Sequence, residues 1–198
     1  MAANDLDDAD ELVQRIGSGN VIAGKAKSAT ELCQGCHGER GDSNRGEYPK
    51  LNGQYADYIL RQFNHFKSGE RKHQLMNNVA SNVSDADVAD IAAYFASNET
   101  MKGNAAVDTQ NAKSLFLRGD MKRDILPCAS CHGQAGKGTF SGSESYPAIG
   151  GQHKTYLREQ LRNWRSGVRG GSGNAMNIIT RSLSDAEIEA LSTYISGL

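Results

Sequence analysis

The second half of the chain repeats the first. The segment Cys33–His37 (Cys-Gln-Gly-Cys-His) returns as Cys128–His132 (Cys-Ala-Ser-Cys-His). Further matches follow in the same order, with only slight drift in spacing: Tyr48-Pro49 with Tyr146-Pro147, Gly53-Gln54 with Gly151-Gln152, Tyr58 with Tyr156, Met76 with Met176, and Tyr94 with Tyr194. Ordered self-similarity of this length indicates one structural unit copied twice. We therefore expect two related domains, over residues 21–103 and 104–198, after an N-terminal acidic tail over residues 1–20.

Each predicted domain is short of apolar residues. Hydrophobic residues make up 38% of the 198 residues, and 22 residues are glycine. A domain of about 90 residues with this composition builds a thin core, and such small domains are usually stabilised by disulfides, a metal or a large cofactor. The net charge of −1 argues against nucleic acid as a partner. No stretch approaches the roughly 20 apolar residues of a membrane-spanning helix.

Both repeats predict the same order of helices. A short helix (residues 24–32 and 112–119) precedes the cysteine motif, a second (residues 55–67 and 154–166) follows it, and a capped helix begins at Ser84 and Ser184. Neither repeat contains a run of alternating β-branched residues, so the sequence predicts an all-α fold. The acidic start, Met1–Glu11, lacks the pattern of a signal peptide and is expected to be a flexible tail.

Cys-x-x-Cys-His is the attachment motif for covalent haem c. The two thiols add to the haem vinyl groups, and the histidine is placed to ligate the iron. The motifs thus predict two haems, whose attachment and ligand residues are Cys33, Cys36 and His37 in the first repeat and Cys128, Cys131 and His132 in the second. The competing interpretations are one zinc site built from both cysteine pairs, or a dithiol redox motif. Neither explains why a histidine follows each pair.

The sixth iron ligand has to come from elsewhere in each repeat. The candidates are His65, His73, Met76 and Met101 in the first repeat, and Met121, His153 and Met176 in the second. Only Met76 and Met176 correspond across the duplication, and both lie in polar stretches that suggest irregular structure before the last helix. Core filling, the usual role of methionine, poorly explains that setting. We predict His/Met ligation of both irons, with His/His ligation at one iron as the alternative.

Four arginines follow a helical spacing in the second repeat. They are Arg158, Arg162, Arg165 and Arg169, and they form a stripe beside an apolar face. One interpretation is a solvated helix face. The other is a surface that docks a partner or pairs with haem propionates.

Together these motifs resemble the cytochrome c4 family, whose members contain two class I cytochrome c domains with one haem each. The resemblance covers nearly the whole chain from Gly24 onward. It rests on the repeated cysteine motif, on residues 48–54 and 66–71, and on the Met and Ser-Asp segments. It implies two tandem class I cytochrome c domains related by a pseudo-twofold axis, with haem propionates near their interface. It also implies that the carbonyls of Pro49 and Pro147 accept hydrogen bonds from the axial histidines.

Two irons with both axial positions filled leave no open site for a substrate, which favours electron transfer over catalysis. The resemblance implies a periplasmic carrier between a cytochrome bc complex or another donor and a terminal oxidase. Its partners would be these complexes or small electron carriers, and peripheral membrane association is compatible with it. On this view the chain is a mature form without its export signal. The rivals are the dihaem subunit of a flavocytochrome c sulfide dehydrogenase and a small dihaem enzyme, such as a peroxidase or a thiosulfate dehydrogenase.

Overall fold

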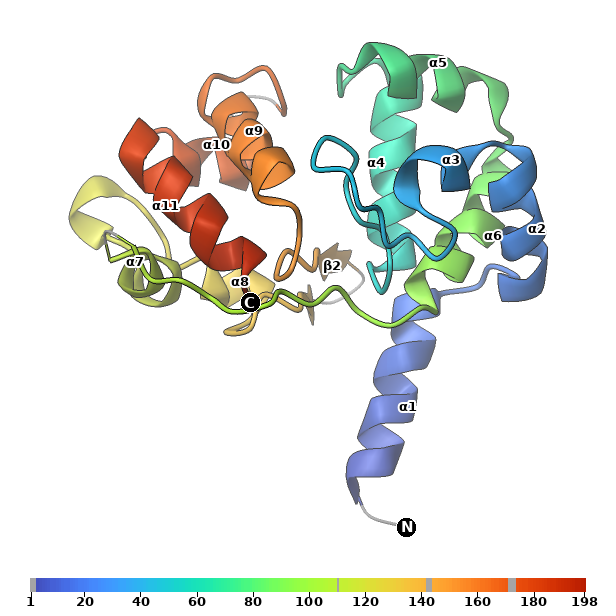
Figure 1. Ribbon diagram of the computed structural model, residues 1–198, viewed down its shortest axis with the longest axis horizontal. Helices are drawn as coiled ribbons and strands as arrows, with labels where there is room; N and C mark the ends of the chain where they lie inside the picture. Colours follow the sequence, from blue (N-terminus) through green and yellow to red (C-terminus); the bar gives the residue numbers. More distant parts are fainter. Residues whose placement is uncertain (1–2, 110, 142–143, 171–173) are drawn as a thin grey trace.

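The computed structural model describes residues 3–109, 111–141, 144–170 and 174–198. Two helical lobes lie side by side, and an extended segment leads from one to the other (Figure 1). The first lobe contains α2 (Val21–Thr30), α3 (Cys33–His37), α4 (Ala56–Ser68), α5 (Gln74–Asn82) and α6 (Asp85–Ala96). The second contains α7 (Ala112–Arg118), the 3-10 turn η1 (Met121–Arg123), α8 (Ala129–His132), α9 (Lys154–Arg165), α10 (Ala175–Thr180) and α11 (Asp185–Ser196).

The predicted fold, two tandem and mainly helical domains, is confirmed, with one small addition. A short antiparallel pair lies in the second lobe, β1 (Thr139–Ser141) with β2 (Glu144–Tyr146), and Phe140 is paired with Ser145. Its strands are three residues each, too short to give a recognisable alternation in the sequence. The pair lies in the loop between the second cysteine motif and Pro147.

The first and last helices of each lobe pack against each other, α2 on α6 and α7 on α11. In the first lobe the crossing point is Gly24, where a Cβ atom would lie 1.9 Å from the carbonyl oxygen of Asp90. Only glycine permits so close an approach. Lys27 then fixes the pair, because its Nζ lies 2.7 Å from Asp87 and 2.6 Å from Asp90 on α6. This contact fixes α2 on α6, and α2 in turn contacts α3, the helix of the cysteine motif.

Each lobe has its own hydrophobic core. The core of the first lobe is formed by Phe63, Phe66, Ala80, Val83, Val88, Ile91, Tyr94 and Phe95. The core of the second includes Phe116, Ile125, Leu157, Leu183, Ile188, Leu191, Tyr194 and Ile195. The final helix of each lobe begins at the predicted serine: the backbone NH of Asp87 donates to Ser84 Oγ, and that of Glu187 donates to Ser184 Oγ.

The N-terminal segment is not the flexible tail that its charge suggested. It contains α1 (Ala3–Ile16), which projects from the first lobe in Figure 1 and contacts α4 and α6. Near its end, Arg15 pairs with Glu11 at 2.7 Å and lies over the Tyr55 ring. High charge predicts disorder, but Leu12 and Ile16 are four residues apart, a spacing that places both on one helical face. None of the described helices is long and apolar enough to cross a membrane.

An arginine reaches from each lobe to the other. Arg169 of the second lobe is 6% exposed and donates to Tyr58 Oη at 3.0 Å and to Gln62 Oε1 at 2.6 Å in the first. Arg71, its counterpart in the repeat, donates to Tyr156 Oη at 2.8 Å and to Gln160 Oε1 at 2.9 Å in the second. The duplication thus yields a pseudo-symmetric interface.

The predicted arginine stripe is therefore not a single surface. Helix α9 ends at Arg165, and Arg169 lies beyond it, in the interface between the lobes. Arg158 and Arg165 instead form ion pairs with Glu189 and Asp185 of α11. The helical spacing alone did not reveal that the chain turns away after Arg165.

Candidate haem sites

Each cysteine motif forms a short helix at the edge of its lobe's core. Helix α3 begins after Leu32, whose left-handed backbone (φ 59°) turns the chain into it. In the second lobe, Pro127 precedes the motif, and its fixed φ suits the entry to a helix. Cys33 packs against the first core and Cys128 against the second. Because the two cysteines of a pair are three positions apart along a helix, both lie within one turn.

The thiols are poorly suited to a shared zinc site. All four cysteines are free, and burial raises the pKa of Cys33 and of Cys128 to about 11. Within the described ranges, no group of three or more His, Cys, Asp or Glu side chains is placed to hold a metal ion. The two pairs instead occupy equivalent places in separate lobes.

The histidine of each motif is held in one tautomer by a backbone carbonyl. His37 Nδ1 lies 2.8 Å from the oxygen of Pro49, and His132 Nδ1 lies 2.8 Å from that of Pro147. A carbonyl only accepts, so Nδ1 carries the proton in both rings. Burial lowers the pKa of both histidines, so the rings are neutral at pH 7. Each Nε2 therefore keeps the lone pair that a metal ligand needs.

Partly buried apolar side chains pack against the core of each lobe, as the first cysteine of its motif does. In the first lobe they are Val21, Cys33, Leu51, Ile59, Leu60, Met76 and Val79. In the second they include Cys128, Ile149, Leu161 and Ile179. A large apolar group seated here would remove this surface from water, which is favourable. The available thiols, the neutral histidine and the apolar surroundings together fit a covalently attached haem in each lobe.

Both predicted methionine ligands lie in helices, not in irregular segments. Met76 lies in α5 and Met176 in α10, and both are half-buried. A side chain caps the N-terminus of each helix: the NH of Met76 donates to His73 Nδ1, and that of Met176 donates to Asn174 Oδ1. The apolar spacing of Met76, Val79 and Ala80 is helical. The short length of these helices hid that signal among polar neighbours.

The other candidate ligands make contacts that differ between the lobes. His65 pairs with Glu70, His73 caps α5, and His153 Nε2 donates to the Ser43 carbonyl at 2.8 Å. Met101 Sδ lies 3.3 Å from Gln152 Nε2, and Met121 is 65% exposed on η1. Only Met76 and Met176 of these candidates occupy equivalent positions, as the sequence repeat indicated.

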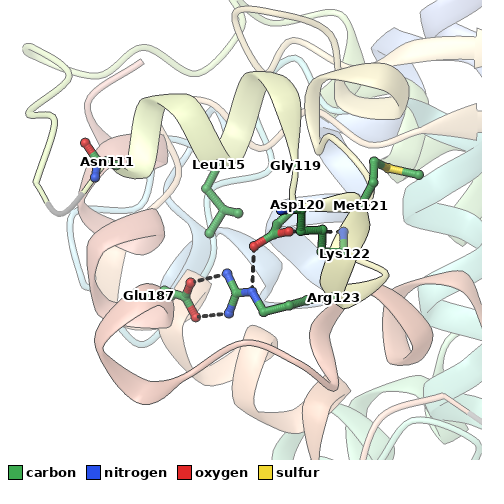
Figure 2. Close-up of a pocket in the computed structure, with 8 residues that line it drawn as sticks. All are labelled: Asn111, Leu115, Gly119, Asp120, Met121, Lys122, Arg123 and Glu187. Atoms are coloured by element: carbon green, nitrogen blue, oxygen red, sulfur yellow. Dashed lines mark hydrogen bonds and ion pairs between the residues drawn. The ribbon is translucent and has the colours of Figure 1, made fainter.

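The surface hollow in Figure 2 is lined by no residue of either motif. Its lining comes from α7 and the residues at its two ends, from η1 and from the start of α11. There Arg123 bridges Asp120 at 2.7 Å and Glu187 at 2.6 Å, and the bond from Arg123, together with those from Ser184, lowers the pKa of Glu187 to about 2. The bridge fastens the segment before the second motif to the last helix.

Sequence reasoning did not recognise the residues that join the lobes. Gln54 and Gln152 are 4% exposed, and each reaches the other lobe beside a motif proline. The sequence repeat already matched these glutamines and the tyrosines at 58 and 156. The repeat showed that both halves of the chain contain these residues, but only the packing of the two lobes shows what they contact.

Comparisons with known proteins agree with this geometry. Residues 111–198 match the family model described as cytochrome c, and residues 20–95 match the one described as cytochrome c oxidase, cbb3-type, subunit III. Cytochrome c4 of Pseudomonas aeruginosa is 39% identical over 91% of this chain and 90% of its own. The thiosulfate dehydrogenase electron acceptor of Stutzerimonas stutzeri is 34% identical over 88% of this chain and 82% of its own.

A solved structure shows the same arrangement of domains. The reduced recombinant cytochrome c4 from Pseudomonas stutzeri superposes with a TM-score of 0.82 at 35% identity, over 91% of this chain and 100% of that one. Two cytochrome c domains, two complete haem-attachment motifs and this likeness over nearly the full length lead to one conclusion. The chain belongs to the cytochrome c4 family of dihaem electron carriers.

Proposed function

We propose that the two lobes bind their haems through equivalent residues. Cys33 and Cys36 attach the first haem and Cys128 and Cys131 the second. The axial pairs are His37 with Met76 and His132 with Met176. The observation that carries this proposal is the pair of buried, neutral histidines, each with Nδ1 bound to a proline carbonyl and Nε2 free for iron. When bound, each haem supplies a one-electron redox centre.

The surrounding residues hold and shield these centres. The carbonyls of Pro49 and Pro147 fix the plane and tautomer of the histidine rings, which raises the basicity of Nε2. The apolar side chains around each motif exclude water. Met76 and Met176 would each hold an iron as its second protein ligand, so no coordination position would remain for a substrate, which supports an electron carrier over an enzyme.

We further propose that the chain is periplasmic, because haem attachment follows export, and that its domains span residues 21–103 and 104–198. As in the family, its electrons would come from a cytochrome bc complex and go to a terminal oxidase. Rapid mixing of the reduced protein with a purified haem–copper oxidase tests this: the proposal predicts saturable reoxidation of both haems. Oxidation no faster than the spontaneous reaction with oxygen would contradict it.

A second donor deserves a test because of one specific likeness. A thiosulfate dehydrogenase electron acceptor is 34% identical over most of this chain. If this chain serves the same role, thiosulfate and a purified thiosulfate dehydrogenase will reduce both haems, and thiosulfate alone will reduce neither. Co-purification with a flavin-containing chain would instead identify it as the subunit of a flavocytochrome c sulfide dehydrogenase.

A further inference from the structure

Two buried glutamines make the same exchange of hydrogen bonds between the lobes. Gln54 Nε2 donates to the carbonyl of Ala148 at 2.7 Å, and the NH of Ala148 donates to Gln54 Oε1 at 2.9 Å. In the other direction, Gln152 Nε2 donates to the carbonyl of Lys50 at 2.9 Å, and the NH of Lys50 donates to Gln152 Oε1 at 2.9 Å. Each glutamine side chain thus forms hydrogen bonds with both the backbone NH and the backbone carbonyl of one residue in the opposite lobe.

The residues held in this way directly follow the motif prolines. Ala148 follows Pro147, whose carbonyl accepts from His132, and Lys50 follows Pro49, whose carbonyl accepts from His37. The carbonyl of one residue and the NH of the next belong to a single rigid peptide plane. The peptide group between Pro147 and Ala148 is therefore bound at its oxygen by His132 and at its NH by Gln54.

We propose that each glutamine is a positioning residue for the haem iron ligand of the opposite lobe. This rests on the proposed assignment of His37 and His132 as axial ligands. Gln54 acts on His132 through the peptide before Ala148, and Gln152 acts on His37 through the peptide before Lys50. Hydrogen bonds in such a chain polarise one another, so a bond at the NH strengthens the carbonyl as an acceptor. A stronger Nδ1–H···O bond makes the histidine a better electron donor to iron.

The consequence is that each reduction potential depends on the contact between lobes. A more basic histidine stabilises the ferric state and lowers the potential. Loss of the Gln54 bonds will therefore raise the potential of the His132 haem, and loss of the Gln152 bonds will raise that of the His37 haem. A bound partner that separates the lobes would break both sets of glutamine bonds and raise both reduction potentials.

The experiment is an NMR-monitored redox titration of the holoprotein, in which each haem is followed by its own resonances. The variants are Gln54→Met and Gln152→Met, which keep the length of the side chain and remove the amide. The controls are Tyr58→Phe and Tyr156→Phe, which each remove one hydrogen bond of the same interface, to Arg169 or Arg71, and touch neither proline peptide.

The expected result is a crossed pattern. Each glutamine variant raises the reduction potential of the haem in the opposite lobe more than that of the haem in its own lobe. The tyrosine variants change the potentials of both haems only slightly. An equal change in the two reduction potentials, or no change in either, overturns the inference. The ferrous protein also reports the ligands, because iron-bound methionine methyl groups resonate far from free ones. If those signals are missing in the unaltered protein, the ligand assignment fails, whatever the glutamine variants do.

Discussion

His132 Nδ1 lies 2.8 Å from the carbonyl oxygen of Pro147, the same distance that joins His37 to Pro49. The two bonds are equal although they span 15 residues in the second lobe and 12 in the first. The added residues fall in the loop that contains β1 and β2, so the hairpin accommodates them without displacing the proline. The distance from each histidine to its proline carbonyl is thus the same in both lobes, although the loop between the histidine and the proline differs in length.

The methionines should set the potential of their own haem. Replacing Met76 or Met176 with His exchanges a thioether for an imidazole, which favours the ferric state. We expect the affected potential to fall by on the order of 0.1 V, within the roughly 0.8 V over which axial ligands act. Spectroelectrochemical titration measures this. Met121→His, on an exposed methionine, is the matched control and should leave both potentials in place.

Both motifs should carry a covalent haem. Thioether bonds survive denaturation, so the intact mass of the unfolded protein should exceed the mass of the chain by two haems, with no thiol left to titrate. The double variant Cys128→Ala with Cys131→Ala should lose one haem and keep the other. A mass that shows a single haem in the unaltered protein would contradict the equivalence of the two motifs.

Arg169 should matter for stability far more than its neighbours on α9. Its guanidinium donates to Gln160, Tyr58 and Gln62 inside the interface. Arg169→Ala removes all three of these bonds, leaves Gln160 and Gln62 with only their bonds to Arg71, and hydrogen bonds to charged groups are worth about 1.5–3 kcal/mol each. We expect the free energy of unfolding to fall by about 3 kcal/mol in denaturant titrations. Arg162→Ala, on an exposed residue, should cost less than about 0.5 kcal/mol.

The bridge in Figure 2 predicts a specific dependence on pH. Arg123 lowers the pKa of Glu187 to about 2 from an ordinary 4.5. The carboxylate therefore stabilises the fold fully above pH 4.5, and this contribution is lost as the pH falls through about 2. Glu187→Gln keeps a side chain that can cap α11. It should lower stability by about 1 kcal/mol at pH 7, since Arg123 is partly exposed.

That difference should shrink as the pH falls and be largely lost near pH 2, where about half of the Glu187 carboxyl groups are protonated. Urea titrations of the two proteins between pH 7 and pH 2 measure it. Glu159→Gln, on an exposed residue of α9, should show no such convergence. A stability gap between Glu187→Gln and the unaltered protein that persisted at pH 2 would show that packing, and not charge, holds this bridge.

The sequence was informative where a local pattern carries the structure. The repeat predicted two domains, the motifs predicted Cys33, Cys36 and His37 with their counterparts, and the Ser84 and Ser184 caps predicted the final helices. Long helices with an apolar face, such as α4 and α9, also followed from spacing. Within the described ranges the two final helices, α4 and α9 lie where they were expected, whereas the haem-binding roles of the cysteines and histidines stay predictions.

Features that depend on packing between segments could not be predicted. The helix of Met76 is only nine residues long, and α10 only six, so polar neighbours obscured their periodicity. Arg169 looked like part of a helix face because spacing does not show where a chain turns. The roles of Gln54 and Gln152 depend on the second lobe, and no local pattern specifies how two lobes meet.

In the proposed function, two methionines, Met76 and Met176, complete two equivalent iron sites. A weak absorption band at the red end of the visible spectrum of the oxidised protein reports iron bound to methionine sulfur. We expect Met76→His and Met176→His each to remove about half of its intensity, and the double variant to remove all of it. A band that is absent from the unaltered protein, or that survives in the double variant, would show that these methionines do not bind the irons.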